Sequence, residues 1–334
     1  MKALIIAEVG VNHNGDLGIA RRLIEAAADA GADLVKFQTF VASDLATPVA
    51  PKAQYQISPS CLNESQHDML SSLELSRQDF VSLKEECRRH NIELFSTAFD
   101  DKSITLVSEF NDTDYVKVPS GEITNLPYLR RLAVLGKNVI LSTGMSDLSD
   151  VDLALRELER NGVNRKDITV LHCNTEYPTP AVDVNLSAMV TMGSALGVNF
   201  GYSDHTAGIE IPIAAVALGA SIIEKHLTLD RSLAGPDHQA SLEPHEFRLM
   251  TQAIRKVEVA LGDGVKRVSP SETKNRAIVR KSIVAAKQIR EGEIFRESNL
   301  TTKRPGTGIS PMRWDELIGR TAERDFKVNE QIEI

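Results

Sequence analysis

The sequence is poor in cysteine and has no long hydrophobic run. Its three cysteines form no C-x-x-C pair, which excludes a disulfide framework and a zinc-ribbon pattern, so we expect reduced thiols at Cys61, Cys87 and Cys173. The longest nearly apolar run, 211–223, is shorter than the roughly 18 residues typical of a membrane span, and Glu8 interrupts the N-terminal run. We therefore expect no membrane span and no signal peptide, and a cytoplasmic location.

An excess of positive charge is also missing, since the formal net charge is −8. The basic residues are scattered, so the chain has no electrostatic footprint for nucleic acid, and an anionic substrate would need local lysines or arginines. Apolar bulk is present: 334 residues with 42% hydrophobic content can bury a large core. This length predicts one large domain and leaves room for a small one.

Short β-branched apolar runs alternate with longer amphipathic stretches over the first ~260 residues, which is typical of βα units around a parallel sheet. Eight such runs are found, at 3–9, 34–38, 92–97, 115–118, 139–142, 168–173, 198–202 and 221–226. Helices are expected at 16–30, 77–90 and 246–261. Eight units predict a (β/α)₈ TIM barrel, with a doubly wound sheet as the alternative. Polar residues at nearly every run's end favour the barrel, where all strand ends meet on one face.

The remaining segments predict an insertion and a second domain. Residues 40–76 are too long for an ordinary βα connection and contain three prolines, so we expect an irregular loop on the substrate side. We predict a TIM-barrel domain at 1–265, a charged linker at 266–281 and a compact domain at 282–334, with short strands at 282–286 and 292–295. A domain of about 50 residues has a marginal core, so we expect it to pack on a partner surface.

Two histidines fall at the ends of neighbouring predicted strands. His205 follows Ser203 and Asp204, and His226 follows Glu224 and Lys225. Two imidazoles with nearby carboxylates suit a divalent cation such as Mn²⁺. The alternative is that each histidine only bonds to backbone. The position of both at predicted barrel ends favours the metal.

Lysines and serines at other strand ends predict an anion site, which would be formed by Lys36, Lys117, Ser120, Ser142 and Ser203. A phosphate group needs lysine charge together with hydroxyl and backbone donors, and TIM barrels often supply these from their βα loops. Any one of these lysines could instead be a solvated loop residue. That explanation is weaker for all of them together.

Three glutamates at strand ends, Glu8, Glu122 and Glu224, are candidates for orienting hydroxyl groups or moving a proton. Glu8 interrupts an apolar strand, where an unpaired charge would be too costly to bury. The Asn-His-Asn-Gly turn at 12–15 serves equally as a ligand contact or as a helix-entry turn. Cys173 and His172 are adjacent on a strand and so point to opposite faces, which favours a buried structural cysteine over a nucleophile.

Several motifs resemble those of the bacterial sialic acid (nonulosonic acid) synthase family, and they run through the whole chain in order. They are AEVGVNHNG (7–15), VKFQT (35–39), PSGE (119–122), HCNTEYPTP (172–180), YSDHT (202–206), EKH (224–226) and GPDH (235–238). The segment TKRPGTGIS (302–310) resembles that family's C-terminal antifreeze-like (SAF) domain.

The resemblance implies a TIM-barrel enzyme that condenses phosphoenolpyruvate with an N-acetylated mannose-type amino sugar by C–O cleavage. It implies a divalent metal, typically Mn²⁺ with Mg²⁺ or Co²⁺ as alternatives, and a domain-swapped homodimer in which Arg304 reaches the partner's site. His205 and His226 would hold the metal, and the phosphate would be bound by Lys117, Ser120, Ser142 and Ser203. Further matches to pocket positions are Lys36, Gln38, Thr97, Tyr177 and Asp237. Either Asn174 or Thr175 would contact phosphate.

For such a reaction Glu122 is our candidate for moving a proton, while Glu8 and Glu224 would position substrate or metal-bound water. Two other interpretations compete: a Schiff-base aldolase with Lys36 or Lys117 as nucleophile, and a non-catalytic carbohydrate-binding protein. The product would be N,N'-diacetyllegionaminate or N-acetylneuraminate, and the motifs leave the acceptor sugar open.

Overall fold

A computed structural model describes residues 2–56 and 64–334 of the chain, so Cys61 and the middle of the 40–76 insertion lie outside the described residues. It divides into two compact units, Met1–Gly262 and Asp263–Ile334. Among the described residues, no helix combines the length and the hydrophobicity needed to cross a membrane.

The first unit contains an eight-stranded parallel sheet, and this confirms the expected βα repeat. Its strands are β1 (Leu4–Gly10), β2 (Leu34–Thr39), β3 (Glu93–Ala98), β4 (Tyr115–Val118), β5 (Asn138–Ser142), β6 (Ile168–His172), β7 (Asn199–Asp204) and β8 (Ile222–His226). The first strand pairs with both β2 and β8. Pairing of the first strand with the last is the topology of a (β/α)₈ barrel, which excludes the doubly wound alternative.

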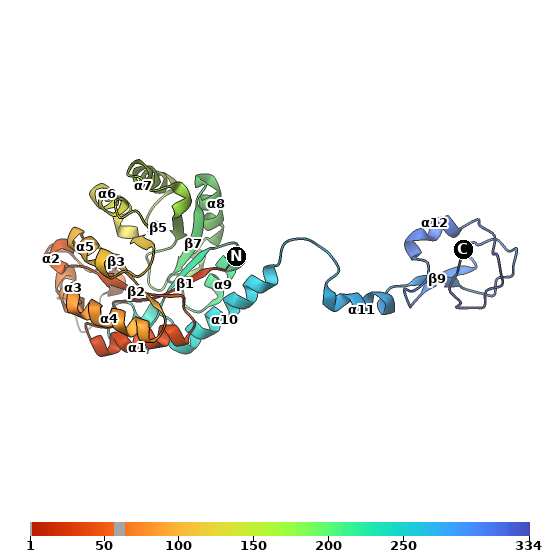
Figure 1. Cartoon of the computed structure of the whole chain (residues 1–334), viewed down its shortest axis with the longest axis horizontal. Helices are drawn as coiled ribbons and strands as arrows, with labels where there is room; N and C mark the ends of the chain where they lie inside the picture. Colours follow the sequence, from red (N-terminus) through yellow and green to blue (C-terminus); the bar gives the residue numbers. More distant parts are fainter. Residues whose placement is uncertain (1, 57–63) are drawn as a thin grey trace. The chain divides into compact units, whose positions relative to one another are not determined.

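Helices lie on the outside of these strands in the first unit (Figure 1). They are α1 (Leu17–Asp29), α4 (Arg77–Arg89), α5 (Asp101–Phe110), α6 (Leu126–Ala133), α7 (Leu148–Arg160), α8 (Leu186–Leu196), α9 (Glu210–Ala217) and α10 (Pro244–Leu261). Several begin at capping boxes, in which a side-chain oxygen satisfies backbone N–H groups of the first turn; Ser76 and Asp79 form one at the start of α4. Their buried apolar faces pack against the outward side chains of the strands.

The strands β3 and β4 are tied together by a side chain. The Tyr128 hydroxyl of α6 lies 2.7 Å from the carbonyl oxygen of Ala98 on β3 and 3.2 Å from that of Lys117 on β4. β3 and β4 are the first and last strands in the hydrogen-bonded order of the sheet, so this hydroxyl links the two ends of that order.

The 40–76 insertion is more regular than its prolines indicate. Its described part contains α2 (Ala42–Leu45), the 3₁₀ turn η1 (Gln54–Gln56) and α3 (Gln66–Leu73). A capping box between Ser65 and Asp68 starts α3. The expectation of an irregular loop was therefore wrong for these segments. Short 3₁₀ turns also follow several strands, namely η2 (Ser120–Glu122), η4 (Ala181–Asp183) and η5 (His238–Ala240), and another, η3 (Arg165–Asp167), precedes β6.

The second unit has its own small apolar core, centred on Ile283, Phe295 and Phe326. Its elements are α11 (Pro270–Val279), β9 (Ser282–Ala285), β10 (Leu300–Lys303), the 3₁₀ turn η6 (Pro311–Arg313) and α12 (Trp314–Leu317). The strand expected at 292–295 makes only an isolated bridge, at Ile294 to Thr321. Helix α11 lies within the expected linker because Ser269 and Glu272 form a capping box there, and it buries no residue.

Candidate active site

Six side chains of the site lie two residues beyond apolar side chains of the barrel interior. The interior layer is formed by Ile6, Leu34, Phe95, Ile140, Leu171 and Ile222. Because side chains alternate along a strand, residues i and i+2 share a face. Glu8, Lys36, Thr97, Ser142, Cys173 and Glu224 therefore form the next layer towards the carboxyl ends of the strands, where TIM barrels carry their active sites.

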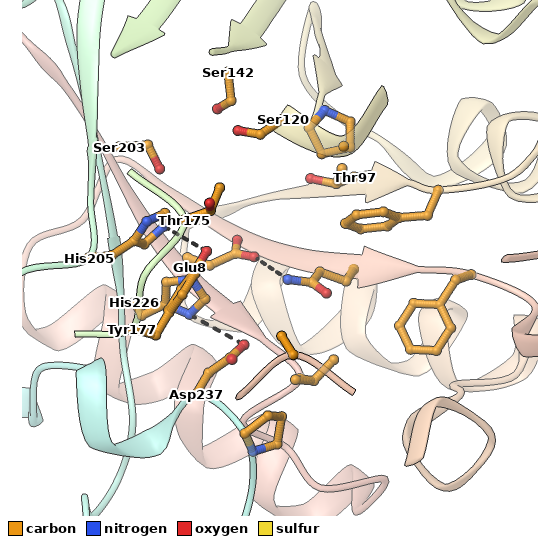
Figure 2. Close-up of a pocket in the computed structure, with 18 of the residues that line it drawn as sticks. Glu8, Thr97, Ser120, Ser142, Thr175, Tyr177, Ser203, His205, His226 and Asp237 are labelled. Atoms are coloured by element: carbon orange, nitrogen blue, oxygen red, sulfur yellow. Dashed lines mark hydrogen bonds and ion pairs between the residues drawn. The ribbon is translucent and has the colours of Figure 1, made fainter. Parts of the chain in front are cut away.

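This polar layer lines a pocket of about 510 Å³. Of the residues expected at the site, the pocket is lined by Glu8, Lys36, Gln38, Thr97, Lys117, Ser120, Glu122, Ser142, Thr175, Tyr177, Ser203, His205, Glu224, His226 and Asp237. A volume of this size is typical of small-molecule sites. Figure 2 shows Ser120 and Ser142 on one side of the pocket, His226 and Asp237 on the other, and Glu8 between them.

Four buried charged side chains form the floor of the pocket. The Lys36 ammonium lies 2.8 Å from Glu224 Oε2 and 3.3 Å from Glu8 Oε2. The Lys117 ammonium donates to the same Glu224 carboxylate, at 2.9 and 3.0 Å. With every group ionised, the two carboxylates balance the two ammonium groups. We call Glu8, Lys36, Lys117 and Glu224 the charged quartet.

Burial and neighbours shift the pKa of the two carboxyl groups in opposite directions. Burial raises the pKa of Glu8 to about 7, against the lowering effect of Lys36. Burial also acts to raise the pKa of Glu224, but Lys117 and Lys36 outweigh it and hold that pKa well below its usual range. Glu224 is therefore the permanent anion of the charged quartet, and Glu8 is the member that gains or loses a proton near neutral pH.

Hydroxyl groups surround one side of the charged quartet. Ser203 donates to Glu224 Oε1 at 3.0 Å, and the Thr97 hydroxyl is buried with no hydrogen-bond partner among the described residues. The Ser120 oxygen accepts from the Gly144 backbone N–H at 3.0 Å. A Cβ at Gly144 would lie 2.6 Å from Thr175 Cγ2 and 2.9 Å from Ser120 Oγ, so only glycine allows this close approach.

The two strand-end histidines lie side by side, with ring centroids 5.5 Å apart. The backbone oxygen of Asn174 lies 2.5 Å from His205 Nδ1, and a carbonyl can only accept, so Nδ1 carries the proton. The Nε2 lone pair then accepts from the Tyr177 hydroxyl at 3.0 Å. Burial lowers the pKa of His205 to about 4 and that of His226 well below its usual value. Both rings are therefore neutral at pH 7.

These two imidazoles fit a divalent cation. His226 Nδ1 is buried without a hydrogen bond among the described residues, and its nearest acidic atom is Asp237 Oδ2 at 3.9 Å. Burial raises the pKa of Asp237 to about 7. Within the described residues, no cluster of three or more His, Cys, Asp or Glu side chains is arranged to hold a metal ion. A cation held by the two histidines would therefore leave several positions for water or substrate.

The remaining expected residues are placed as follows. Thr175 lines the pocket, whereas the Asn174 side chain accepts from the Glu176 backbone N–H at 2.7 Å. Glu122 is the last residue of η2 and lines the pocket, and burial raises its pKa. Arg304 belongs to the second unit, where its Nε donates to the Val279 carbonyl at 2.9 Å.

The two described cysteines and the Asn-His-Asn-Gly turn take structural positions, with one qualification. Cys87 and Cys173 are free thiols, and His172 bonds to the Val184 carbonyl at 2.7 Å, as expected for side chains on opposite faces. Cys173 is buried, but it lines the pocket and lies 3.3 Å from Ser120 Oγ, so it is more than a core residue. In the turn, Asn12 donates to the carbonyl of Leu227 and to Ser241, not to the pocket.

Two sets of residues at the site were not expected from the sequence. Tyr55 stacks on Tyr177 with ring centroids 4.8 Å apart, and Tyr177 stacks on His205 at 4.1 Å. Lys225 and Asp204 form a fully buried ion pair of 2.6 Å directly behind the two histidines. The only available signal for this pair was that each residue precedes a strand-end histidine.

Comparisons with known proteins agree with the geometry. The NeuB family model matches residues 23–266 and the SAF domain model matches residues 280–333. The N,N'-diacetyllegionaminic acid synthase of Campylobacter jejuni is 52% identical, with 99% of each chain covered. The enzyme of the same name from Legionella pneumophila is 44% identical, over 96% of this chain and 90% of its own. The crystal structure of N-acetylneuraminic acid synthetase from Leptospira borgpetersenii superposes with a TM-score of 0.71 at 34% identity, over 82% of this chain and 90% of that one.

Proposed function

The chain belongs to the NeuB family, and we propose on that basis that it condenses phosphoenolpyruvate with an N-acetylated mannose-type amino sugar. The products are a nonulosonic acid and inorganic phosphate. The observation that carries this proposal is one pocket that combines a charged quartet, a set of hydroxyl donors and two neutral histidines. The names of the relatives favour N,N'-diacetyllegionaminate as the product, with N-acetylneuraminate as the alternative.

Phosphoenolpyruvate would bind at the hydroxyl side of the pocket. The hydroxyls of Ser120, Ser142 and Thr97 and the ammonium groups of Lys36 and Lys117 supply the charge and the hydrogen bonds that a phosphate and a carboxylate require. The Thr97 hydroxyl has no protein partner among the described residues, so it is available to a ligand oxygen. Thr175, rather than Asn174, lies at the pocket and is the better candidate for a phosphate contact.

The histidine side would receive the sugar. A divalent metal bound by His205 and His226, with Mn²⁺ as our candidate, would supply Lewis-acid polarisation of the open-chain aldehyde. The Asn174 carbonyl fixes the His205 tautomer in which Nε2 keeps its lone pair, and a metal bound there would replace the hydrogen bond from the Tyr177 hydroxyl. Asp237, whose pKa burial raises to about 7, lies beside His226 and can accept hydrogen bonds from sugar hydroxyl groups.

The reaction forms one C–C bond and breaks one C–O bond. C3 of phosphoenolpyruvate attacks the aldehyde carbon, the aldehyde oxygen takes a proton, water adds at C2, and the C2–O bond to phosphate breaks. Glu122 is our candidate for moving a proton because burial raises its pKa and it lines the pocket. Glu224 holds both lysines in place, and Glu8 positions substrate. Orientation of the two reactants supplies much of the rate enhancement.

The test measures phosphate release from phosphoenolpyruvate with Mn²⁺ and either N-acetylmannosamine or 2,4-diacetamido-2,4,6-trideoxymannose, each with and without EDTA. We expect release that needs the sugar and stops with chelator. With ¹⁸O in the bridging position, C–O cleavage places the label in the released phosphate. Activity that survives EDTA and is lost on borohydride treatment would instead establish a Schiff-base aldolase, and binding without turnover would establish a carbohydrate-binding protein.

Matched histidine variants test the metal assignment. His205→Asn and His226→Asn are expected to lose turnover and Mn²⁺ binding, the latter measured by electron paramagnetic resonance. His245→Asn is the control, because that side chain is 70% exposed at the start of α10. A role for Arg304 in the site of a partner subunit is also part of the proposal. It requires a dimer in solution, so a monomer by light scattering would remove it.

A further inference from the structure

One wall of the pocket is apolar, and the charges of the floor do not extend to it. Besides Val11, six side chains of one satellite cluster also line the pocket: Phe40, Leu45, Met69, Leu70, Leu73 and Phe99. We call them the apolar wall. They come from α2, α3 and the loops after β2 and β3, whereas the charged quartet comes from the strands themselves. The pocket therefore has a polar floor built on the barrel and an apolar side built on the insertion.

The wall results from the phase of helix α3. Gln66, Met69, Leu70 and Leu73 are spaced i, i+3, i+4 and i+7, so they lie on one face of the helix, and all four line the pocket. The capping box at Ser65 and Asp68 sets where the helix begins. One end of this face carries the Gln66 amide and the rest is hydrocarbon and thioether.

The wall is anchored to the barrel by hydrogen bonds and by aromatic packing. Asp100 Oδ2 accepts from the Val41 backbone N–H at 2.8 Å, and Glu74 Oε1 accepts from the Ala42 N–H at 2.5 Å. The rings of Phe40 and Phe99 meet edge to face, with centroids 6.4 Å apart. Because these contacts tie the insertion to the ends of β2 and β3, the wall is a built surface at a defined position.

Phosphoenolpyruvate has no group suited to this wall. It is small and anionic, and it carries neither a methyl nor a longer alkyl group. The acceptor sugar must therefore provide the apolar contact. N-acetylmannosamine has one methyl group, whereas 2,4-diacetamido-2,4,6-trideoxymannose has three: one at C6 and one on each acetamido group. A hydroxyl at C6 would lose its hydrogen bonds to water on a surface that offers none in return.

We infer that the apolar wall binds the methyl groups at C6 and on the C4 acetamido group of a 2,4-diacetamido-2,4,6-trideoxy sugar, with the Gln66 amide beside the acetamido group. The inference rests on the proposed function and names the part of the chain that selects among its acceptors. It also predicts how strongly the protein prefers one acceptor sugar over another. An apolar surface discriminates against one added hydroxyl by roughly 10²-fold, whereas a site that hydrogen-bonds a hydroxyl discriminates by roughly 10⁴-fold or more.

The experiment compares kcat/KM for three acceptors at saturating phosphoenolpyruvate and Mn²⁺. The acceptors are N-acetylmannosamine, its 6-deoxy analogue and 2,4-diacetamido-2,4,6-trideoxymannose, so each step in the series changes one substituent position. For the wild-type protein we expect kcat/KM to rise along the series, and removal of the C6 hydroxyl alone to raise it by roughly 10- to 200-fold. A rise of less than about threefold at that step, or a fall, would overturn the inference.

Variants locate the selection on the wall. Met69→Gln and Leu70→Gln replace apolar groups with amides of similar size, and each is expected to lower the C6 selectivity ratio at least tenfold, because one contact of this kind is worth roughly 10-fold or more. Met69→Leu keeps the surface apolar at similar volume and is expected to leave the ratio within about threefold. An unchanged ratio in both folded glutamine variants would overturn the inference. If neither glutamine variant folds, the wild-type acceptor series decides.

The outcomes separate the inference from the proposed function. If the wild-type protein releases no phosphate with any of the three sugars, the proposed function fails and the inference with it. If phosphate is released but the C6 step shows no preference, the function stands and only the inference fails. A C6 preference above roughly 10⁴ would also count against the wall, because discrimination of that size requires a buried hydrogen-bonding group.

Discussion

The buried ion pair behind the histidines gives a sharp stability prediction. Lys225 Nζ lies 2.6 Å from Asp204 Oδ2, and neither side chain is exposed to solvent. The same ammonium also donates to the Thr206 carbonyl, and Asp204 Oδ1 accepts from the Thr206 N–H at 3.0 Å. The pair therefore joins β7 to β8 and holds the turn that follows His205.

Lys225→Met leaves the Asp204 carboxylate buried without its counter-ion. Removal of one partner from a buried pair costs about 3–5 kcal/mol, because the remaining charge has lost both water and its partner. We therefore expect the free energy of unfolding in urea to fall by about this amount. In Lys225→Met/Asp204→Asn no buried charge remains, and the asparagine oxygen can still accept from the Thr206 N–H. The double variant should lose less than either single variant.

An exposed pair of the same length serves as the control. Lys102 and Asp44 also lie 2.6 Å apart, but their side chains are 71% and 32% exposed. Lys102→Met is expected to cost at most about 1 kcal/mol, since water screens such pairs. The reasoning would be refuted if Lys225→Met cost no more than this control, or if the double variant lost the sum of the two single effects.

Three further predictions follow from other contacts. Tyr128→Phe removes the hydroxyl that links β3 to β4 and should lower the free energy of unfolding by about 1–2 kcal/mol; an unchanged urea midpoint would contradict that link. Gly144→Ala should raise the KM for phosphoenolpyruvate at least about tenfold, because its Cβ would displace Ser120 and Thr175; steady-state kinetics with an unchanged KM would show that the close approach does not matter. Glu8, with a pKa raised to about 7 by burial, is partly ionised at neutral pH. Since an approaching anion raises that pKa further, the protein should take up protons when it binds phosphoenolpyruvate at pH 7–8, and Glu8→Gln should abolish this uptake. Calorimetry in two buffers of different ionisation enthalpy measures the number of protons taken up. Proton release by the wild-type protein would contradict the predicted sign.

Much of the barrel was predictable because a parallel sheet covered on both faces leaves a strong hydrophobic signal. The polar residues that end these runs pointed to the pocket for a similar reason, since inward positions repeat every second residue. Ion-pair partners were less accessible. Nothing in the strand patterns says that Lys36 and Lys117 share Glu224, because this depends on which strands face each other across the barrel.

The insertion was the main failure of sequence reasoning. Its prolines indicated an irregular loop, yet Met69, Leu70 and Leu73 follow a helical period within a single short helix. Eight residues give too few turns for that period to stand out. The sequence also left open whether Asn174 or Thr175 contacts phosphate. The Asn174 side chain accepts from the Glu176 N–H within a turn, and a comparison of motifs does not show such a turn contact.

The division of the pocket between strands and insertion has a consequence for how acceptor preference can change. The charged quartet and the histidines are held by ladder hydrogen bonds of the barrel, so a substitution there disturbs both the chemistry and the fold. The inward face of α3 contributes to neither the sheet nor the charged quartet. Exchange of this one helical face is therefore the shortest route by which an ancestral enzyme, or a laboratory selection, could adopt a different sugar while retaining the same bond-forming apparatus.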